Sequence, residues 1–448
     1  MDRSGHRRSA RAVALGLLLL HSSCTSSGVD LGLSKSEEDE SGIAAVAPPP
    51  EEGPRLGGIA NNTPILERPA SGAKTIGALH AGSFVVRGAE PVRTSRQCPA
   101  GFYAIWPRGV VCLNHGATLD LEHPTLAAMA LEPNLEQPLP YTYGRLVRES
   151  PLLERDVSRE DAVKIVRPLP QSSSFAVVGS WTARIGDGEP ERLGLLTNGR
   201  FVRAADLEAA RPSSFAGRAL SGNKALPMAF IVKRGVRQWK LDGARPEKAE
   251  PLDYHAAVSL TGRFRTVGAT KYWATEQELW VRHQDVTLVS RRSKLPEFAR
   301  DNQRWIDVSV QLGTLVAYEG TEPVFATLVS AGRGRLGDSA ASVPSKDVTR
   351  LGTFEVVAKH VTWLSGAPER AAEPYALLDL PWTLELESGQ AFYGAYWHDR
   401  FGIEHGPGDL MLSPADAQYL FRWTQPSLPK GWHSVGSDTS KTWVTLRK

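Results

Sequence analysis

The sequence predicts a mainly β protein made of several domains. Its 448 residues exceed the length of one ordinary domain, which is about 150 residues. Short apolar runs recur along the chain between turn residues, which is typical of small β-rich units. The composition, with 41% hydrophobic and 23% charged residues, is that of a soluble globular protein.

The N-terminus carries the pattern of a secretory signal. Basic residues up to Arg11 precede an apolar run over residues 12–20, and small residues follow it. The run is too short to span a bilayer. The end of this segment, residues 21–24, resembles a bacterial lipoprotein lipobox, in which Cys24 would be lipidated and become the mature N-terminus. Cleavage nearby without lipidation is the alternative.

We therefore expect residues 1–24 to be a signal peptide, and the protein to be exported as a periplasmic or outer-membrane-anchored lipoprotein of a bacterium. Residues 25–72 have the composition of a disordered linker. They contain an acidic run at 36–41 and a proline-rich stretch at 47–53, and no apolar period that could bury a core. Such a segment would tether the folded part to a membrane.

Residues 73–148 predict a first small β module. The apolar runs at 82–87, 102–106 and 109–112 are separated by turn residues at close intervals, which favours a small barrel or sandwich. In this strand rhythm the segment resembles the bacterial SH3-like modules of secreted cell-wall proteins.

Each of the three cysteines has a structural or anchoring explanation: lipidation for Cys24 and a disulfide for Cys98 and Cys112. In an oxidising compartment Cys98 and Cys112 can form a disulfide that closes a short loop, worth about 3 kcal/mol in the chain-entropy model. The residues between them predict a strand, a turn at Pro107 and Gly109, and a second strand. A reactive thiol is the alternative.

Residues 149–300 predict two further small β modules. The segments 201–207 and 280–286 share the pattern aromatic-Val-Arg-x-x-Asp-apolar, which indicates an internal repeat. Each would end its module with a strand and a tight turn. Chance similarity over seven positions is the alternative.

Residues 301–448 predict the final domain. Three β-rich runs at 305–310, 313–318 and 323–330 follow one another at hairpin spacing. Further on, the segments 349–354 (Thr-Arg-Leu-Gly-Thr-Phe) and 412–417 (Leu-Ser-Pro-Ala-Asp-Ala) resemble motifs of the peptidoglycan L,D-transpeptidase (YkuD-type) family. The resemblance implies a β-sandwich or mixed fold.

The catalytic motif of that family is degenerate in this chain. The family loop has the sequence Ser-His-Gly-Cys, and alignment on 412–417 places Gly406, Pro407, Gly408 and Asp409 at these four positions. Tyr393 stands where an earlier histidine is expected. A shift by one residue would still place Pro407 at the cysteine, and residues 113–448 contain no cysteine.

In the family, the resemblance implies acyl transfer from a stem peptide by a cysteine thiolate that a histidine activates. With both groups replaced, we expect a pseudoenzyme that binds peptidoglycan stem peptides or a cell-wall enzyme. Its candidate groove is formed by Trp397, His398, His405 and Asp409. The alternative is an active transpeptidase, carboxypeptidase or hydrolase with a site rebuilt from Asp409, His405 and His398.

No cofactor, metal or nucleic acid is expected. The net charge is +3, without the clustered basic patch that nucleic acid requires. The spacing of His398, His405 and Asp409 matches no known metal-ligand pattern. The segment 332–337 fits Gly-x-Gly-x-x-Gly, but no amphipathic helix follows it, as dinucleotide binding would require.

Overall fold

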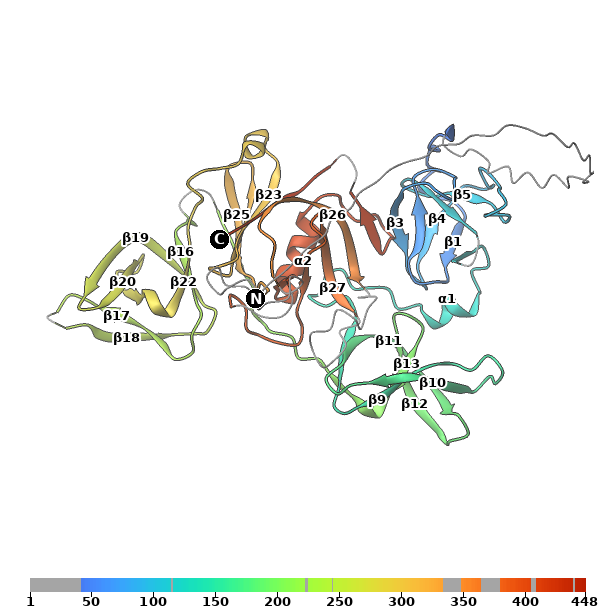
Figure 1. Cartoon of the computed structure of the whole chain (residues 1–448), viewed down its shortest axis with the longest axis horizontal. Coiled ribbons are helices and arrows are strands. Elements are labelled where there is room, and N and C mark those ends of the chain that lie inside the picture. Colours follow the sequence, from blue (N-terminus) through green and yellow to red (C-terminus); the bar gives the residue numbers. More distant parts are fainter. Residues whose placement is uncertain are drawn as a thin grey trace, which may run out of the picture. The chain divides into compact units, whose positions relative to one another are not determined.

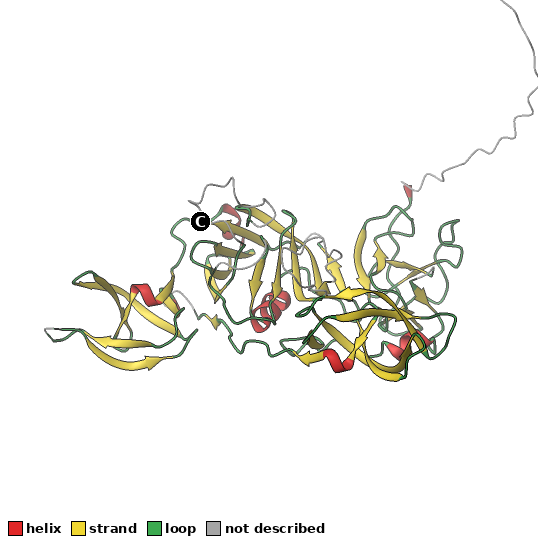
Figure 2. Cartoon of the chain, turned by 60° about the horizontal axis from the view of Figure 1, so that its bottom comes forward, coloured by secondary structure: helices red, strands yellow, loops and turns green. Residues whose placement is uncertain are grey.

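The computed structural model describes residues 42–113, 116–221, 225–243, 245–332, 348–363, 379–403, 408–437 and 440–448. In these ranges strands dominate, and the α-helices are α1 (Pro124–Ala128) and α2 (Pro414–Trp423). Figure 2 shows the same balance, with strands in every folded part. The prediction of a mainly β chain with several sheets is confirmed. The signal segment and Cys24 lie outside the described residues.

The first module consists of two small sheets. One has the order β4-β1-β7, and the other includes β3-β2-β6-β5. Their bounds are β1 (Arg55–Gly58), β2 (Thr63–Leu66), β3 (Thr75–Leu79), β4 (Phe84–Val86), β5 (Phe102–Ala104), β6 (Val110–Cys112) and β7 (Ala117–Thr118). An isolated bridge between Arg87 and Ile105 connects the strand ends of β4 and β5.

This module begins earlier than predicted. Residues 55–66, which we placed in the disordered linker, form β1 and β2, and the side chains of Leu56 and Ile65 are fully buried. The linker prediction was therefore wrong for these residues. The partners of β1 lie far along the chain, with Gly57 opposite Thr118. Local composition could not show such pairing.

The second module is a sheet with the order β10-β9-β13-β12-β11-β8-β14. Its strands are β8 (Thr142–Leu146), β9 (Ser150–Arg155), β10 (Ala162–Leu169), β11 (Ser174–Ile185), β12 (Pro190–Leu196), β13 (Phe201–Arg203) and β14 (Leu207–Ala209). A 3-10 turn, η2 (Ala204–Asp206), joins the last two.

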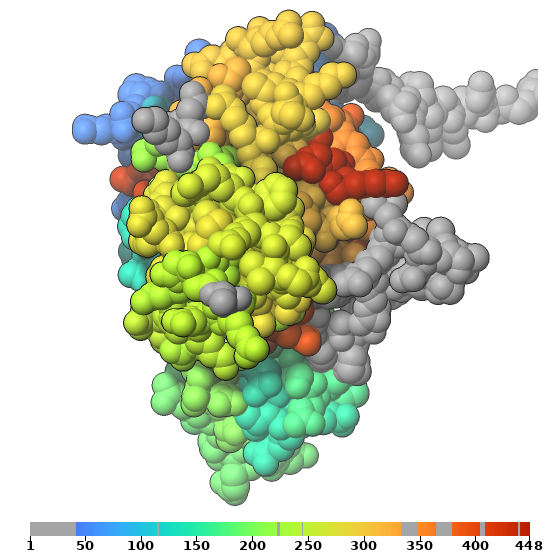
Figure 3. Space-filling model, turned by 90° about the vertical axis from the view of Figure 1, so that its left-hand side faces the viewer, coloured from blue at the N-terminus to red at the C-terminus, as the bar shows by residue number. Residues whose placement is uncertain are grey.

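The third module has the corresponding order β18-β17-β21-β20-β19-β16-β22. Its strands are β16 (Met228–Ile231), β17 (Val236–Lys240), β18 (Glu247–Leu252), β19 (Ala257–Val267), β20 (Thr270–Thr275), β21 (Trp280–Arg282) and β22 (Val286–Val289). The 3-10 turn η4 (His283–Asp285) joins the last two. This module, yellow-green in Figure 3, faces the viewer there.

The two modules therefore repeat one topology, and the first module follows the same order once its β4–β5 bridge is included. The sequence echo marks equivalent places, because both segments form strand, 3-10 turn and strand. Its aspartates are also equivalent. Asp206 accepts hydrogen bonds from Arg148 and from Ser150 Oγ at 2.7 Å, and Asp285 accepts one from Arg282. Both carboxylates are buried.

The final domain begins with the antiparallel strands β23 (Arg304–Ser309), β24 (Thr314–Glu319) and β25 (Glu322–Leu328), which confirms the three predicted runs. It continues with β26 (Gly352–Trp363), β27 (Leu380–Leu386), β28 (Ala391–Gly394), β29 (Leu410–Leu412), β30 (Ser434–Gly436) and β31 (Trp443–Arg447). Helix α2 packs its buried residues Ala417, Leu420 and Phe421 into the core against the sheet.

Two strand pairings cross the predicted domain borders. β30 pairs with β26 and also with β3 of the first module, with Ala78 opposite Ser434. β15 (Arg218–Ala219), which lies between the second and third modules in sequence, pairs with β25. The short 3-10 helix η5 (Glu297–Asp301) leads into the final domain. The β3–β30 pairing brings residues of the first module next to the segment around Ser434, near the C-terminal end of the chain.

Candidate functional site

Asp409 is the residue that we predicted to stand at the nucleophile position, and its carboxylate has a structural role. It lies just before β29, which runs parallel to β28. Its Oδ1 atom accepts the backbone N–H of Ala391 at 2.9 Å. The Asp409 side chain thus links Ala391, the first residue of β28, to the residue that directly precedes β29.

Gly408, the residue before Asp409, is contacted by the segment 349–354 and by Gln390. The carbonyl of Gly408 accepts hydrogen bonds from Thr349 Oγ1 at 2.9 Å and from the Gln390 side chain. Thr349 Oγ1 in turn accepts the N–H of Gly332 at 2.9 Å. The threonine that opens the segment 349–354 therefore holds Gly408, the residue before Asp409.

The segment 412–417 forms the start of α2. Ser413 is the N-cap, and its Oγ accepts the N–H of Asp416 at 3.2 Å, while Pro414 occupies the first turn. Serine at the N-cap and proline at the first helical position are strongly favoured, because they satisfy or remove backbone donors without partners. Helix capping thus accounts for Ser413 and Pro414 of this segment.

Asp416 adds a buried link from this helix to other elements. Its carboxylate accepts the N–H of Gly217 at 2.7 Å and the hydroxyl of Thr327. Burial raises its pKa to about 6, against the opposing effect of the hydrogen bonds from Thr327, Gly217 and Ser413. The aspartate therefore ties α2 to β25 and to Gly217, the residue before β15.

Tyr393 lies on β28 opposite Met411 of β29 and is 2% exposed. Its ring belongs to a buried cluster, and its centroid is 6.1 Å from that of Trp397. A large aromatic ring thus fills the position where the predicted resemblance would place a histidine.

Trp397 lines a cavity together with Tyr396, and neither His398 nor Asp409 is among the residues of its walls. Its volume is about 200 Å³. Apart from Trp397 and Tyr396, its walls come from the second module, including Arg145, Glu208 and Arg211. Glu208 forms ion pairs with both arginines, at 3.3 and 3.7 Å.

His398 caps a turn. Its Nδ1 accepts the N–H of Arg400 at 3.2 Å, and its ring centroid lies 5.0 Å from that of Phe401. His405, Gly406 and Pro407 lie outside the described residues, so the predicted grouping of His398, His405 and Asp409 stays a prediction. Within the described ranges, no group of three or more His, Cys, Asp or Glu side chains could hold a metal ion.

The disulfide between Cys98 and Cys112 is present and confirms the prediction. It connects the residues before β5 with the end of β6, and Cys98 is fully buried. The strand, turn and strand predicted between the cysteines correspond to β5 and β6.

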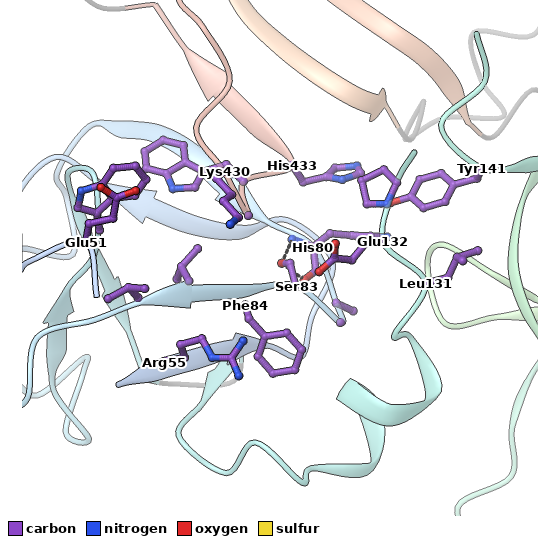
Figure 4. A pocket seen from close by; sticks show the side chains of 18 residues that line it. Glu51, Arg55, His80, Ser83, Phe84, Leu131, Glu132, Tyr141, Lys430 and His433 are labelled. Atoms are coloured by element: carbon purple, nitrogen blue, oxygen red, sulfur yellow. Dashed lines mark hydrogen bonds between the residues drawn. The ribbon is translucent and has the colours of Figure 1, made fainter. Parts of the chain in front are cut away.

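A second cavity, of about 280 Å³, was not predicted (Figure 4). His80 follows β3 and His433 precedes β30, and their rings stack with centroids 4.4 Å apart. Tyr141 lies beside both rings, with its centroid at 6.5 Å from each. The histidines are far apart in sequence and only the β3–β30 pairing joins them, so no local pattern could have indicated this site.

Burial keeps both histidines neutral at neutral pH. Desolvation lowers the pKa of His80 to about 4. It also lowers the pKa of His433 well below its usual value, and nearby His80 and His360 add to this effect. His433 Nε2 lies 3.2 Å from the carbonyl oxygen of Thr362. Because a carbonyl only accepts, this nitrogen carries the proton of the neutral ring and Nδ1 is an acceptor.

Within the described ranges, no helix is both long enough and apolar enough to cross a membrane. No family model matches the sequence, and no curated protein matches it.

Several solved structures show weak similarity. An L,D-transpeptidase from Mycobacterium smegmatis is 17% identical, over 54% of this chain and 100% of that chain, with a TM-score of 0.25. One from Xylanimonas cellulosilytica is 18% identical, over 32% and 60%, with a TM-score of 0.23. One from Stackebrandtia nassauensis is 17% identical, over 33% and 56%, with a TM-score of 0.22. The matched part of this chain thus spans about three fifths of the length of the last two structures. Similarity at this level establishes no shared activity.

Proposed function

We propose that residues 301–448 form an L,D-transpeptidase-like domain that binds peptidoglycan stem peptides without catalysing acyl transfer. The sequence resemblance at 349–354 and 403–417 supports this proposal. Its support is stronger because Thr349 of the first segment donates a hydrogen bond to Gly408 of the second. Thr349 and Gly408 are 59 positions apart in the sequence, so this hydrogen bond joins the two segments.

The observation that carries the proposal is the hydrogen bond from Ala391 N–H to the carboxylate of Asp409. Acyl transfer requires a thiolate with a lowered pKa and a base within hydrogen-bond reach. An ionised carboxylate, with a reference pKa of about 3.9, is a poor nucleophile toward an amide. Residues 113–448 contain no cysteine, so no thiol of this domain can replace it.

The proposal includes export and anchoring through Cys24. The Cys98–Cys112 disulfide is consistent with an oxidising compartment outside the cytosol. The three β modules with one strand order are proposed to be SH3-like units that add contacts to the wall or to a cell-wall enzyme. A Cys24→Ala variant is expected to leave the membrane fraction, and a variant that stays there would contradict lipid anchoring.

The binding claim is tested with purified sacculi and the full chain. We expect the protein to co-sediment with sacculi, because the loop and its neighbouring groove are proposed to recognise stem peptides. Failure to co-sediment would contradict the proposal.

Inactivity is tested separately, by analysing muropeptides after incubation with the protein. We expect no new 3-3 cross-links and no trimming of tetrapeptides to tripeptides. Trimming that is lost in Asp409→Ala would show a rebuilt enzyme instead. Asp187→Ala is the matched control, since the Asp187 side chain is 99% exposed in the second module.

A further inference from the structure

The cavity beside His80 and His433 has the size of a small ligand site. Its walls come from the turn between β3 and β4, the turn at Trp106 and the segment 430–433. In Figure 4, Lys430 and His433 lie on one side of His80 and Ser83, and Arg55 and Phe84 lie on the other. A volume of about 280 Å³ is near the lower limit of about 300 Å³ for ligand pockets. It suits a single ring rather than a long chain.

Two side chains of this cavity have buried nitrogens without hydrogen-bond partners in the described part of the chain. They are both ring nitrogens of His80, which is 6% exposed, and the indole nitrogen of Trp432, which is 3% exposed. Buried polar groups in folded proteins are nearly always paired, so each exception calls for an explanation. These nitrogens are also shielded from solvent, so a ligand in the cavity would pair with them only after a wall side chain had moved.

The state of these groups limits the ligand. A neutral imidazole offers one donor and one acceptor, and an indole offers one donor. This set matches hydroxyl and amide groups, which both donate and accept. A carboxylate or a phosphate would need several donors, and an ammonium several acceptors.

The remaining walls are aromatic and the rim is electrically balanced. Phe84, Trp106 and Tyr141 line the cavity together with Trp432, and aromatic rings provide apolar faces against which a flat ring can pack. The charged residues at the cavity are exposed and comprise two acids and two bases: Glu51, Glu132, Arg55 and Lys430. Their formal charges cancel, so the rim favours neither anions nor cations.

We propose that this cavity binds a neutral hydroxylated ring, namely one sugar residue of a glycan. The apolar face of the sugar would pack on the aromatic walls, and its hydroxyl or acetamido groups would pair with His80 and the Trp432 indole N–H. The site is separate from the loop at Gly408. It therefore goes beyond the proposed function and does not depend on it.

The test is a titration of the full chain with N-acetylglucosamine and its tetramer, followed by calorimetry and saturation-transfer NMR. Glucosamine and inorganic phosphate serve as a cationic and an anionic comparator. We expect saturable binding of the neutral sugars in preference to both comparators. Trp432→Phe is expected to weaken it about tenfold, which corresponds to the loss of one good contact.

Two further variants make the result specific. Leu131→Trp places a larger side chain at a wall residue that is 50% exposed, so it is expected to reduce binding without disturbing the core. Trp239→Phe is the matched control, because the Trp239 indole nitrogen also lacks a partner among the described residues but lies on β17. It is expected to bind as the unmodified protein does.

The proposal is overturned if neutral sugars do not bind, if phosphate or glucosamine binds better, or if Trp432→Phe and Leu131→Trp both keep full affinity. Failure of the chain to co-sediment with sacculi, combined with normal binding of free sugar, would contradict only the proposed stem-peptide function. Sugar binding that fails while sacculi are still bound would contradict only the cavity.

Discussion

At the scale of single residues, Asp409, which we predicted to stand at a nucleophile's position, shows how a side chain can serve the backbone. Its acceptor oxygen lies 2.9 Å from the N–H of Ala391, and Ala391 begins β28. A buried backbone donor that loses its acceptor costs about 1–3 kcal/mol. The residue therefore has a structural role that does not require any chemistry.

We predict that Asp409→Ala lowers the free energy of unfolding by about 1–3 kcal/mol, because the Ala391 N–H loses its acceptor. Asp409→Asn retains an acceptor oxygen and is expected to lose less than half as much. Chemical denaturation monitored by tryptophan fluorescence measures both values. Equal losses in the two variants would show that the charge, and not the acceptor, matters.

At the scale of elements, the N-terminus of α2 combines a serine cap with a proline in the first turn. The Ser413 oxygen accepts the N–H of Asp416, so one of the donors that a helix start leaves unpaired is satisfied. The resemblance at 412–417 coincides with this cap, which explains why these residue types occur together.

Ser413→Ala is predicted to cost about 1 kcal/mol, the usual value for losing an N-cap. Ser413→Asp should restore most of that loss, because its carboxylate can accept the same N–H. Thermal melts of the two variants give the comparison. Ser293→Ala, at an exposed position, is the control and should melt as the unmodified protein does.

The disulfide between Cys98 and Cys112 is the second feature at this scale whose contribution to stability can be measured. It closes a loop between residues separated by 14 positions, for which the chain-entropy model gives about 3 kcal/mol. The double variant Cys98→Ser, Cys112→Ser is expected to lose stability by that order. A reductant should lower the melting temperature of the unmodified protein and leave that of the double variant unchanged. If the reductant lowers both melting temperatures, its effect does not come from the disulfide.

At the scale of the whole molecule, Asp379 joins the second module to the final domain. Its carboxylate accepts the N–H of Ala176 at 3.0 Å and the hydroxyl of Thr197 at 2.7 Å, and both partners belong to the second module. Asp379 itself is 1% exposed. Burial raises its pKa from 3.8 to about 6, although the hydrogen bonds from Thr197, Ala176 and Thr362 act in the opposite direction.

This shift makes stability depend on pH. An acid whose pKa is higher in the folded than in the unfolded protein holds its proton more tightly when folded. Its contribution is therefore complete below pH 3.8 and is lost as the pH rises through about 6. A shift of this size corresponds to about 3 kcal/mol, and Asp416, with the same direction of shift, adds to the trend.

We predict that Asp379→Asn weakens the loss of stability between pH 4 and pH 7, since the neutral side chain cannot ionise. Melting temperatures measured across this range, for the variant and the unmodified protein, give the difference. Asp187→Asn, whose side chain is 99% exposed, should retain the original pH dependence. Identical profiles for all three proteins would contradict the role of Asp379.

The sequence by itself determined the mainly β class, the disulfide, the strands of residues 304–328 and the equivalence of segments 201–207 and 280–286. Each depends on local pattern: apolar runs between turns, two cysteines flanking a hairpin, or a repeated string. Such patterns survive in the sequence because the interactions involved are close along the chain or alike in each copy.

Only the tertiary structure decided where β1 finds its partners, how Asp379 and Asp416 connect separate elements, and that His80 and His433 share a cavity. It also assigned Asp409 to the backbone of β28. These contacts join residues that are remote in sequence, and their energies come from burial and from hydrogen bonds that form only after the sheets have paired. A local pattern holds no record of such partners, so they could not be predicted from the chain alone.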